Sequence, residues 1–269
     1  MTAQNVPNRT AGSGVSGFWI LLSLVAGTYL MFIVALLVAT ATYATPGDLF
    51  RAMESREIQY SIVLSLLTCS ITALLSLIIA VPTGYLLARS NFRGKSLAEA
   101  ALDIPIVLPP MVIGLCLLIF FQTPTGHALE KIIPFTYTVY GVVLAQLVIG
   151  AAFAIRTMRG TFDHLSSRPE EVAMTLGCSR GRAVWLVTLP AAWKGMLAAM
   201  SVAWARSLGE FGPILVFAGA TRMKTEVLPT TVWLELSVGN LEAAVAVSML
   251  MVAFAMIVLV AVRWAGERI

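Results

Sequence analysis

The chain has 269 residues, of which 58% are hydrophobic and 12% are charged. Ordinary soluble domains contain about 45–50% apolar and about 25% charged residues, so a water-soluble fold of this size could not cover its surface with so few charges. The composition therefore predicts an integral membrane protein. The formal net charge of +4 reflects how Lys and Arg are distributed among the loops, and it indicates no nucleic-acid partner.

Charged residues are absent from five long stretches of the chain, at 10–47, 58–88, 104–129, 132–155 and 243–262. A hydrocarbon core of ~30 Å needs about 20 apolar residues in a helix, and each stretch is long enough. A sixth stretch, 195–220, contains only Arg206 and Glu210 as charges; being four apart, they can neutralise each other on one helix face. The fold class is therefore predicted as all-α, a polytopic bundle with helices near 17–42, 58–88, 98–121, 136–158, 195–219 and 240–263.

The orientation follows from the loops that carry Lys and Arg. If both termini are cytoplasmic, the inner segments hold twelve of these residues and the outer loops hold five, which matches the positive-inside rule. A cleaved signal peptide is the alternative for the first span, but its apolar run exceeds the ~7–15 residues of a signal core. We interpret it as an anchor. Residues 1–16 are predicted to be a disordered cytoplasmic tail, and 17–269 a single transmembrane domain.

Candidate catalytic and metal-binding residues are scarce. Cys69 and Cys116 fall within predicted spans and Cys178 in an inner loop, so no disulfide framework is expected. His127 and His164 both fall in loops and lie far from any cysteine in the sequence. An intramembrane enzyme would need a nucleophile with a base, or a metal, at membrane depth. We therefore predict no catalytic residue, no metal site and no cofactor.

The long inner loop, 159–194, carries helix signals. Ser167 and Glu170 are spaced as a capping box, with Pro169 in the first turn. Gly177 is placed to end this helix in the left-handed conformation. A second amphipathic piece, 180–189, is expected to end at Pro190. Two short helices at the inner membrane surface suggest a docking surface for another protein; the alternative is a helix pair lying on lipid.

A motif in this loop resembles that of permease subunits of ATP-binding-cassette (ABC) importers, which reads Glu-Ala-Ala, three residues, Gly, nine residues, Ile-x-Leu-Pro. Here the corresponding residues are Glu171-Val172-Ala173, Gly177 and Val187-Thr188-Leu189-Pro190. The spacing is kept throughout, and Val172 and Val187 are mild departures. The segments 103–110 and 206–212 are similar to the third and fifth helices of molybdate permeases, from which Pro213 and Ile214 depart.

The resemblance implies a division of labour. Two permease subunits, interpreted here as a homodimer in the lipid bilayer of a bacterial inner membrane, would form the pathway. Two copies of a separate ATPase subunit would hydrolyse ATP inside, and an extracytoplasmic solute-binding protein would deliver an oxyanion of the molybdate or tungstate type. Sulfate or another small solute is the alternative. The residues implied in ATPase coupling are Glu170, Glu171, Val172, Ala173, Gly177, Leu189 and Pro190, with the tips of both acids facing the partner.

Six further residues are candidates for the translocation pathway or its gate: Asp103, Pro105, Pro109, Pro110, Arg206 and Glu210. The three prolines interrupt helical hydrogen bonding, and a broken helix suits a gate. The charged residues have a purely structural alternative. Arg206 and Glu210 could fix helix packing, and Asp103 could gain from the helix dipole near the inner end of its span.

Overall fold

The structure is a computed structural model that describes residues 17–43 and 46–267, in two units that divide after Thr45. The predicted tail, 1–16, lies outside the described residues. The first unit contributes one helix, α1 (Gly17–Tyr43), whose 27 residues are apolar and long enough to cross a membrane. No β-strand occurs between residues 17 and 43 or between 46 and 267, so the predicted all-α class is confirmed.

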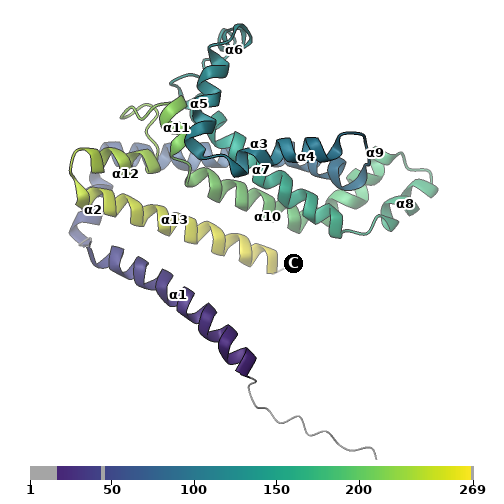
Figure 1. The fold of residues 1–269 in the computed structure, drawn as a ribbon, viewed down its shortest axis with the longest axis horizontal. Helices are drawn as coiled ribbons and strands as arrows, with labels where there is room; N and C mark the ends of the chain where they lie inside the picture. Colours follow the sequence, from purple (N-terminus) through teal and green to yellow (C-terminus); the bar gives the residue numbers. More distant parts are fainter. Residues whose placement is uncertain (1–16, 44–45, 268–269) are drawn as a thin grey trace, which may run out of the picture. The chain divides into compact units, whose positions relative to one another are not determined.

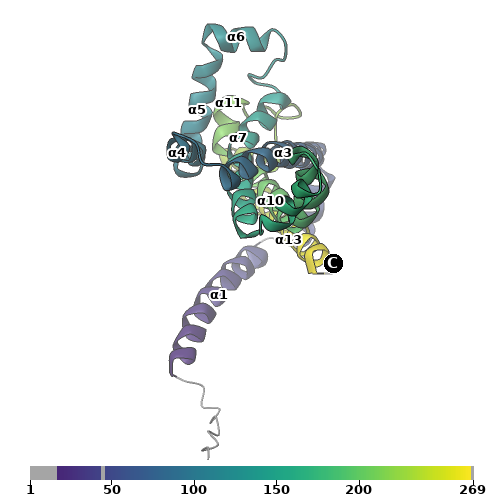
Figure 2. The ribbon, with the colours of Figure 1, turned by 90° about the vertical axis from the view of Figure 1, so that its right-hand side faces the viewer.

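The second unit is a helical bundle in which α3, α7 and α10 run alongside one another (Figures 1 and 2). Figure 1 shows α8 and α9 at one end of this bundle, and α2 and α12 at the other. The elements of the second unit are α2 (Pro46–Glu54), α3 (Arg56–Arg89), α4 (Lys95–Val107), α5 (Pro110–Phe121), α6 (Pro124–Glu130), α7 (Val139–His164), α8 (Arg168–Thr175), α9 (Arg180–Ala183), the π-helix η1 (Val184–Thr188), α10 (Leu189–Leu208), α11 (Gly212–Phe217), α12 (Leu228–Ser237) and α13 (Leu241–Glu267).

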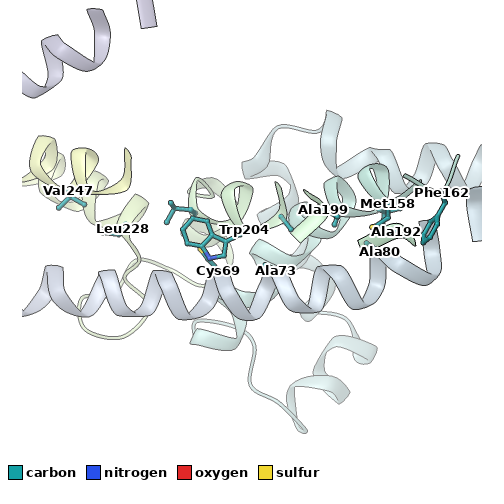
Figure 3. Packing of buried hydrophobic residues seen from close by; sticks show 14 of the residues in the cluster. Cys69, Ala73, Ala80, Met158, Phe162, Ala192, Ala199, Trp204, Leu228 and Val247 are labelled. Carbon is teal, nitrogen blue, oxygen red and sulfur yellow. The ribbon is translucent and has the colours of Figure 1, made fainter. Parts of the chain in front are cut away.

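Small residues line the contact between the three central helices. Ala73 and Ala80 on α3 and Ala199 on α10 are buried beside larger side chains such as Trp204 (Figure 3). Small residues let helix backbones approach closely, which matters because lipid provides no hydrophobic force that drives helices together. The approach is close at Gly84, where an added Cβ would lie 2.8 Å from Cβ of Met158, and closer still at Gly195 of α10, which lies against Thr161 of α7. The centre of the bundle is therefore held by close packing.

Four described helices are long enough and apolar enough to cross a membrane: α1, α3, α7 and the 241–261 part of α13. Two further spans are bent pairs. Helices α4 and α5 meet at 111°, and the segments 180–191 and 193–208 meet at 72°. The count reaches six if each pair is one span, which is compatible with the prediction.

The fifth predicted span, 195–219, begins close to the straight segment 193–208, but it is not one continuous helix. Helix α10 begins at Leu189 and stops at Leu208, and α11 follows a break. The break has a local cause, because Pro213 has no N–H to donate and its ring clashes with the carbonyl group four residues earlier, at Gly209. The third span was also not one helix, because α4 ends at Val107 and α5 begins at Pro110.

Candidate functional site: the helix α8 and two helix breaks

The predicted docking helix is present as α8, and it ends as its sequence indicates. Gly177 has φ of +94°, a conformation that glycine reaches without steric penalty. The N–H of Gly177 donates to the carbonyl of Met174 at 3.0 Å, and the N–H of Cys178 donates to that of Ala173 at 3.1 Å. This pair of bonds is a Schellman motif, which satisfies carbonyl groups that the end of the helix leaves free.

The predicted capping box is wrong. The Ser167 side chain makes no capping hydrogen bond, and the Glu170 side chain turns inward, where the residue is only 6% exposed. Its carboxylate accepts hydrogen bonds from Tyr85 Oη at 2.5 Å and from Thr188 Oγ1 at 2.9 Å. Two hydroxyl donors satisfy a buried carboxylate better than one backbone N–H at an exposed helix end. The expectation that the tip of Glu170 faces a partner is therefore also wrong.

The exposed face of α8 is formed by other residues. Val172 is 56% and Leu176 81% exposed, and Glu171 beside them is exposed as well. Val172 and Leu176 are four residues apart, so they lie on the same side of the helix. Ala173 is half-buried. The helix thus presents a small apolar surface with an adjacent carboxylate.

The second predicted helix of the loop continues into the membrane-spanning α10. Residues 180–208 are helical without a gap, through α9 and the π-helical η1. The predicted break at Pro190 is present as a bend: Pro190 lies in the first turn of α10, and the segments 180–191 and 193–208 meet at 72°. Because the helical segment runs on through Pro190, the missing N–H removes a backbone hydrogen bond to the preceding turn, which accounts for the bend. Leu189 and Pro190 line an apolar groove of about 840 Å³, together with Trp185, Trp193 and residues of α3.

The ion pair between Arg206 and Glu210 is present, but the two residues do not share a helix face. Arg206 lies in the last turn of α10, and Glu210 lies in the break that follows it. The Glu210 side chain is 2% exposed and that of Arg206 is 37% exposed. The Arg206 guanidinium also lies over the Phe153 ring of α7, 5.2 Å from its centroid, a favourable cation–π arrangement.

The break after α10 lies against the break between α4 and α5. An added Cβ on Gly212 would lie 3.0 Å from the backbone N of Met111, and one on Gly114 would lie 2.8 Å from Cα of Pro213. Pro109 and Pro110 are at the α4–α5 break as predicted. Pro105 is not, because it lies inside α4, two residues before that helix ends.

Asp103 lies in the third turn of α4, too far from the helix N-terminus for the predicted gain from the dipole. It lines a small cavity with Arg156, while Glu99 and Arg159, which line the same cavity, form an ion pair at 3.0 Å. The structure therefore groups Asp103 with charges of α4 and α7, apart from the Arg206–Glu210 pair.

Sequence reasoning missed a buried polar contact at the centre of the bundle. Gln146 on α7 is 1% exposed; its Nε2 donates to the Ser207 carbonyl at 3.2 Å, and Thr72 Oγ1 donates to its Oε1 at 3.2 Å. The signal was an amide side chain inside a stretch without charges, since intramembrane polar groups usually face another helix. Gln146 thus joins α3, α7 and the end of α10.

Within residues 17–43 and 46–267, no three His, Cys, Asp or Glu side chains are grouped so that they could hold a metal ion. The candidate site consists instead of α8, in the loop between α7 and α10, and two adjoining helix breaks between the spans. This combination defines a membrane-embedded transport subunit. Residues 80–269 match the family of binding-protein-dependent transport system inner membrane components, and the chain belongs to that family.

Curated relatives agree with this assignment. A molybdate/tungstate transport system permease protein of Pyrococcus abyssi is 40% identical over 154 residues, which are 57% of this chain and 58% of that protein. A molybdenum transport system permease protein of Mycobacterium tuberculosis is 33% identical over 91% of this chain and 92% of its own length. The chain is thus a multi-pass permease subunit of the inner membrane. It is not itself an enzyme, and the ATPase is a separate subunit.

Solved structures confirm the fold. A chain in the crystal structure of a bacterial alginate ABC transporter, in complex with an alginate pentasaccharide-bound periplasmic protein, aligns with a TM-score of 0.71. The alignment covers 93% of this chain and 94% of that chain at 15% identity. The family description names a binding protein as part of such systems. This chain is therefore the membrane component of an importer that also includes an ATPase and a binding protein.

Proposed function

We propose that this chain carries an oxyanion of the molybdate or tungstate type across the inner membrane. The proposed substrate rests on the similarity of this chain to curated relatives whose names state molybdate, tungstate or molybdenum transport. The segments at 103–110 and 206–212, which resemble the same permeases, support it. They flank the adjoining breaks of α4–α5 and α10–α11, where a small polar solute would have to pass.

The functional unit in this proposal is a homodimer of this chain with two ATPase subunits inside and one binding protein outside. The residues 17–269 form the permease domain of each copy, and 1–16 are a cytoplasmic tail. The test is uptake by the reconstituted complex in liposomes with its binding protein. We expect ATP-dependent accumulation of molybdate or tungstate. Accumulation of sulfate with no response to molybdate would overturn the substrate and leave the transport class intact.

The proposed contact with the ATPase is the exposed face of α8. Glu171, Val172 and Leu176 point away from the bundle, and Ala173 is small enough to allow a close approach. Glu171 lies in the first turn of a helix, where a negative charge is stabilised by the helix dipole. A carboxylate beside an apolar patch suits a groove that has a basic residue at its rim.

Charge reversal tests this contact. Glu171→Lys is expected to leave the permease folded, because the side chain is exposed, and to reduce capture of the ATPase at least tenfold. The matched control is Glu54→Lys, an exposed charge reversal on α2 at the other end of the unit. Capture is measured by pull-down beside ATP-driven uptake. If Glu171→Lys captures ATPase and transports like the control, α8 is a surface helix and the proposal is wrong.

The gate in this proposal is formed where the two helix breaks adjoin, with Arg206 and Glu210 at its edge and Pro109 and Pro110 opposite. The partial exposure of the Arg206 side chain supports a role toward the pathway. Asp103 and Pro105 lie on α4 before the break, and they are proposed to position it. Arg206→Gln should reduce uptake while leaving ATPase capture unchanged.

The orientation, with both termini cytoplasmic, can be tested independently. Thr125 on α6 and Asn91 after α3 are exposed residues on opposite sides of the membrane in this proposal. In a background without Cys69, Cys116 and Cys178, an impermeant maleimide added outside should label cysteine at 125. Cysteine at 91 should react only after the membrane is opened. Reversed labelling would overturn the docking role of α8 as well.

A further inference from the structure

We propose that Glu170 is a positioning residue that ties the docking helix α8 to the second and fifth spans, whereas its neighbour Glu171 makes the contact with the ATPase. The inference rests on the proposed coupling function and divides it between two adjacent acids. It starts from a difference between them: Glu170 is 6% exposed, and Glu171 is exposed. Two neighbouring carboxylates on one short helix thus face opposite environments.

The tie uses both oxygens of the Glu170 carboxylate. Tyr85 on α3 donates its hydroxyl hydrogen to Oε1 at 2.5 Å, and Thr188 at the end of η1 donates to Oε2 at 2.9 Å. Hydrogen bonds to an ionised acceptor are shorter and stronger than bonds between neutral groups. Because each oxygen is held from a different element, the first turn of α8 is fixed to α3 and η1 at once.

The anchor on the α3 side is itself immobilised. The Tyr85 ring packs edge-on against Phe162 of α7, with centroids 5.5 Å apart and planes at 90°. One turn further along α3, Arg89 Nη2 donates to the Leu165 carbonyl at 2.6 Å, which holds the segment that leads into α8. The docking helix therefore begins from a point fixed to both α3 and α7.

The anchor on the other side leads directly into a span. Thr188 is the last residue of η1, and α10 begins at the next residue without a gap. A π-helical turn inside a helix is found frequently at functional positions. A displacement of α8 would thus move the inner start of α10 through Glu170 and Thr188. The far end of α10 carries Arg206, beside the proposed gate.

The test uses substitutions that remove single hydrogen bonds and preserve size: Tyr85→Phe, Thr188→Val and Glu170→Gln, with Glu171→Gln as the matched control on the same helix. Three quantities are measured on the complete complex in liposomes with its binding protein: ATPase capture, ATP hydrolysis and the number of anions taken up per ATP. The purified variants are first compared by size-exclusion chromatography in detergent.

We expect Tyr85→Phe and Glu170→Gln to capture ATPase within twofold of the unmodified chain, while uptake per ATP falls at least fivefold. The double variant should be no worse than either single variant, because both remove the same connection. Thr188→Val should give a smaller loss of uptake per ATP, since the hydrogen bond from Thr188 to Glu170 is longer than that from Tyr85. Glu171→Gln should show the reverse pattern: weaker capture, with uptake per ATP unchanged in the complexes that form.

Two results would overturn the inference. If Glu170→Gln weakens ATPase capture as much as Glu171→Gln while Tyr85→Phe transports normally, Glu170 is itself a contact. If Tyr85→Phe, Thr188→Val and Glu170→Gln all transport at the unmodified yield, the bonds are packing only. Either result leaves the proposed function standing provided that Glu171→Lys still blocks capture; a neutral Glu171→Lys would instead remove the coupling proposal itself. If Glu170→Gln does not fold, Tyr85→Phe decides alone, because it removes only one hydroxyl group.

Discussion

Two loops, one between α7 and α10 and one between α11 and α12, each bury one glutamate, but the two carboxylates have different partners. In the first loop, Glu170 has a hydroxyl donor on each oxygen. In the second loop, Glu226 is fully buried, and neither carboxylate oxygen has a hydrogen bond of normal geometry from the residues that the structure describes. Burial raises the pKa of the Glu226 carboxyl above its ordinary value, and the nearby Thr231 hydroxyl and the charge of Arg222 offset this only in part.

The loop between α11 and α12 is instead held by an arginine. Arg222 pairs with Glu57 at the start of α3 and with Glu235 of α12, the latter at 2.8 Å. Asn240 Nδ2 donates to the other oxygen of Glu235 at 2.9 Å. Burial alone therefore does not determine whether a carboxyl group links structural elements. Glu170 joins elements as an acceptor, Glu235 does so as the partner of a cation, and Glu226 does neither.

The largest expected effect comes from removing the arginine. Arg222→Met leaves Glu57 and Glu235 without this cation beside a buried third carboxyl group; breaking a fully buried pair costs on the order of 3 kcal/mol, and partial exposure of Arg222 and Glu57 lowers the cost here. The melting temperature of the purified protein should fall markedly. Lys224→Met, an exposed change in the same loop, should leave it almost unchanged. Equal melting temperatures for the two variants would show that Arg222 does not hold the loop.

A smaller effect is expected at the end of α8. Gly177→Ala places a Cβ at φ of +94°, where no other atom is within 4 Å, so the cost is conformational. It should destabilise the helix end by about 1 kcal/mol. Gly160→Ala is the matched control, because Gly160 lies inside α7 with equally free space, and alanine there should stabilise. Hydrogen exchange of 168–178 measures the first effect, and the melting temperature measures the second. Unchanged exchange in Gly177→Ala would show that the Glu170 contacts alone order the loop.

The smallest effect depends on pH. Because its folded-state pKa is raised, Glu226 contributes most to stability below the ordinary carboxyl value of about 4.3, and that contribution is lost as pH rises through the raised pKa. Glu226→Gln mimics the neutral form. It should raise the melting temperature by about 2–4 °C at pH 8, with a gain that shrinks as the pH is lowered to 5. A gain that does not depend on pH would show that Glu226 is not ionised in the folded protein.

The spans could be predicted because charges cannot enter lipid cheaply, so gaps between charged residues mark them directly. The end of α8 at Gly177 was also predictable, since the left-handed conformation selects glycine at that one position. The direction of Glu170 could not be predicted. Its partners Tyr85 and Thr188 lie 85 and 18 residues away, and a sequence pattern does not reveal which of two adjacent acids turns inward.

Proline was the other source of error, because its effect depends on its position in the helix. Pro190 lies beside a 72° bend in a segment that stays helical from 180 to 208, whereas Pro109 and Pro110 separate two helices, at 111°. Pro105 lies inside α4 with no break at its own position. The α10–α11 break could have been predicted from Gly209 and Pro213, which are four residues apart.

The adjoining breaks have a consequence for water. A helix end leaves about four backbone N–H or C=O groups without helical partners, and lipid offers none, so irregular backbone at membrane depth must be covered by protein or reached by water. Helix ends on both sides of the α4–α5 and α10–α11 breaks meet in one small region, where Gly212 lies against Met111. We expect water to reach this region inside the bilayer. The free backbone N–H and C=O groups could then replace part of the hydration shell of an ion that has left bulk water.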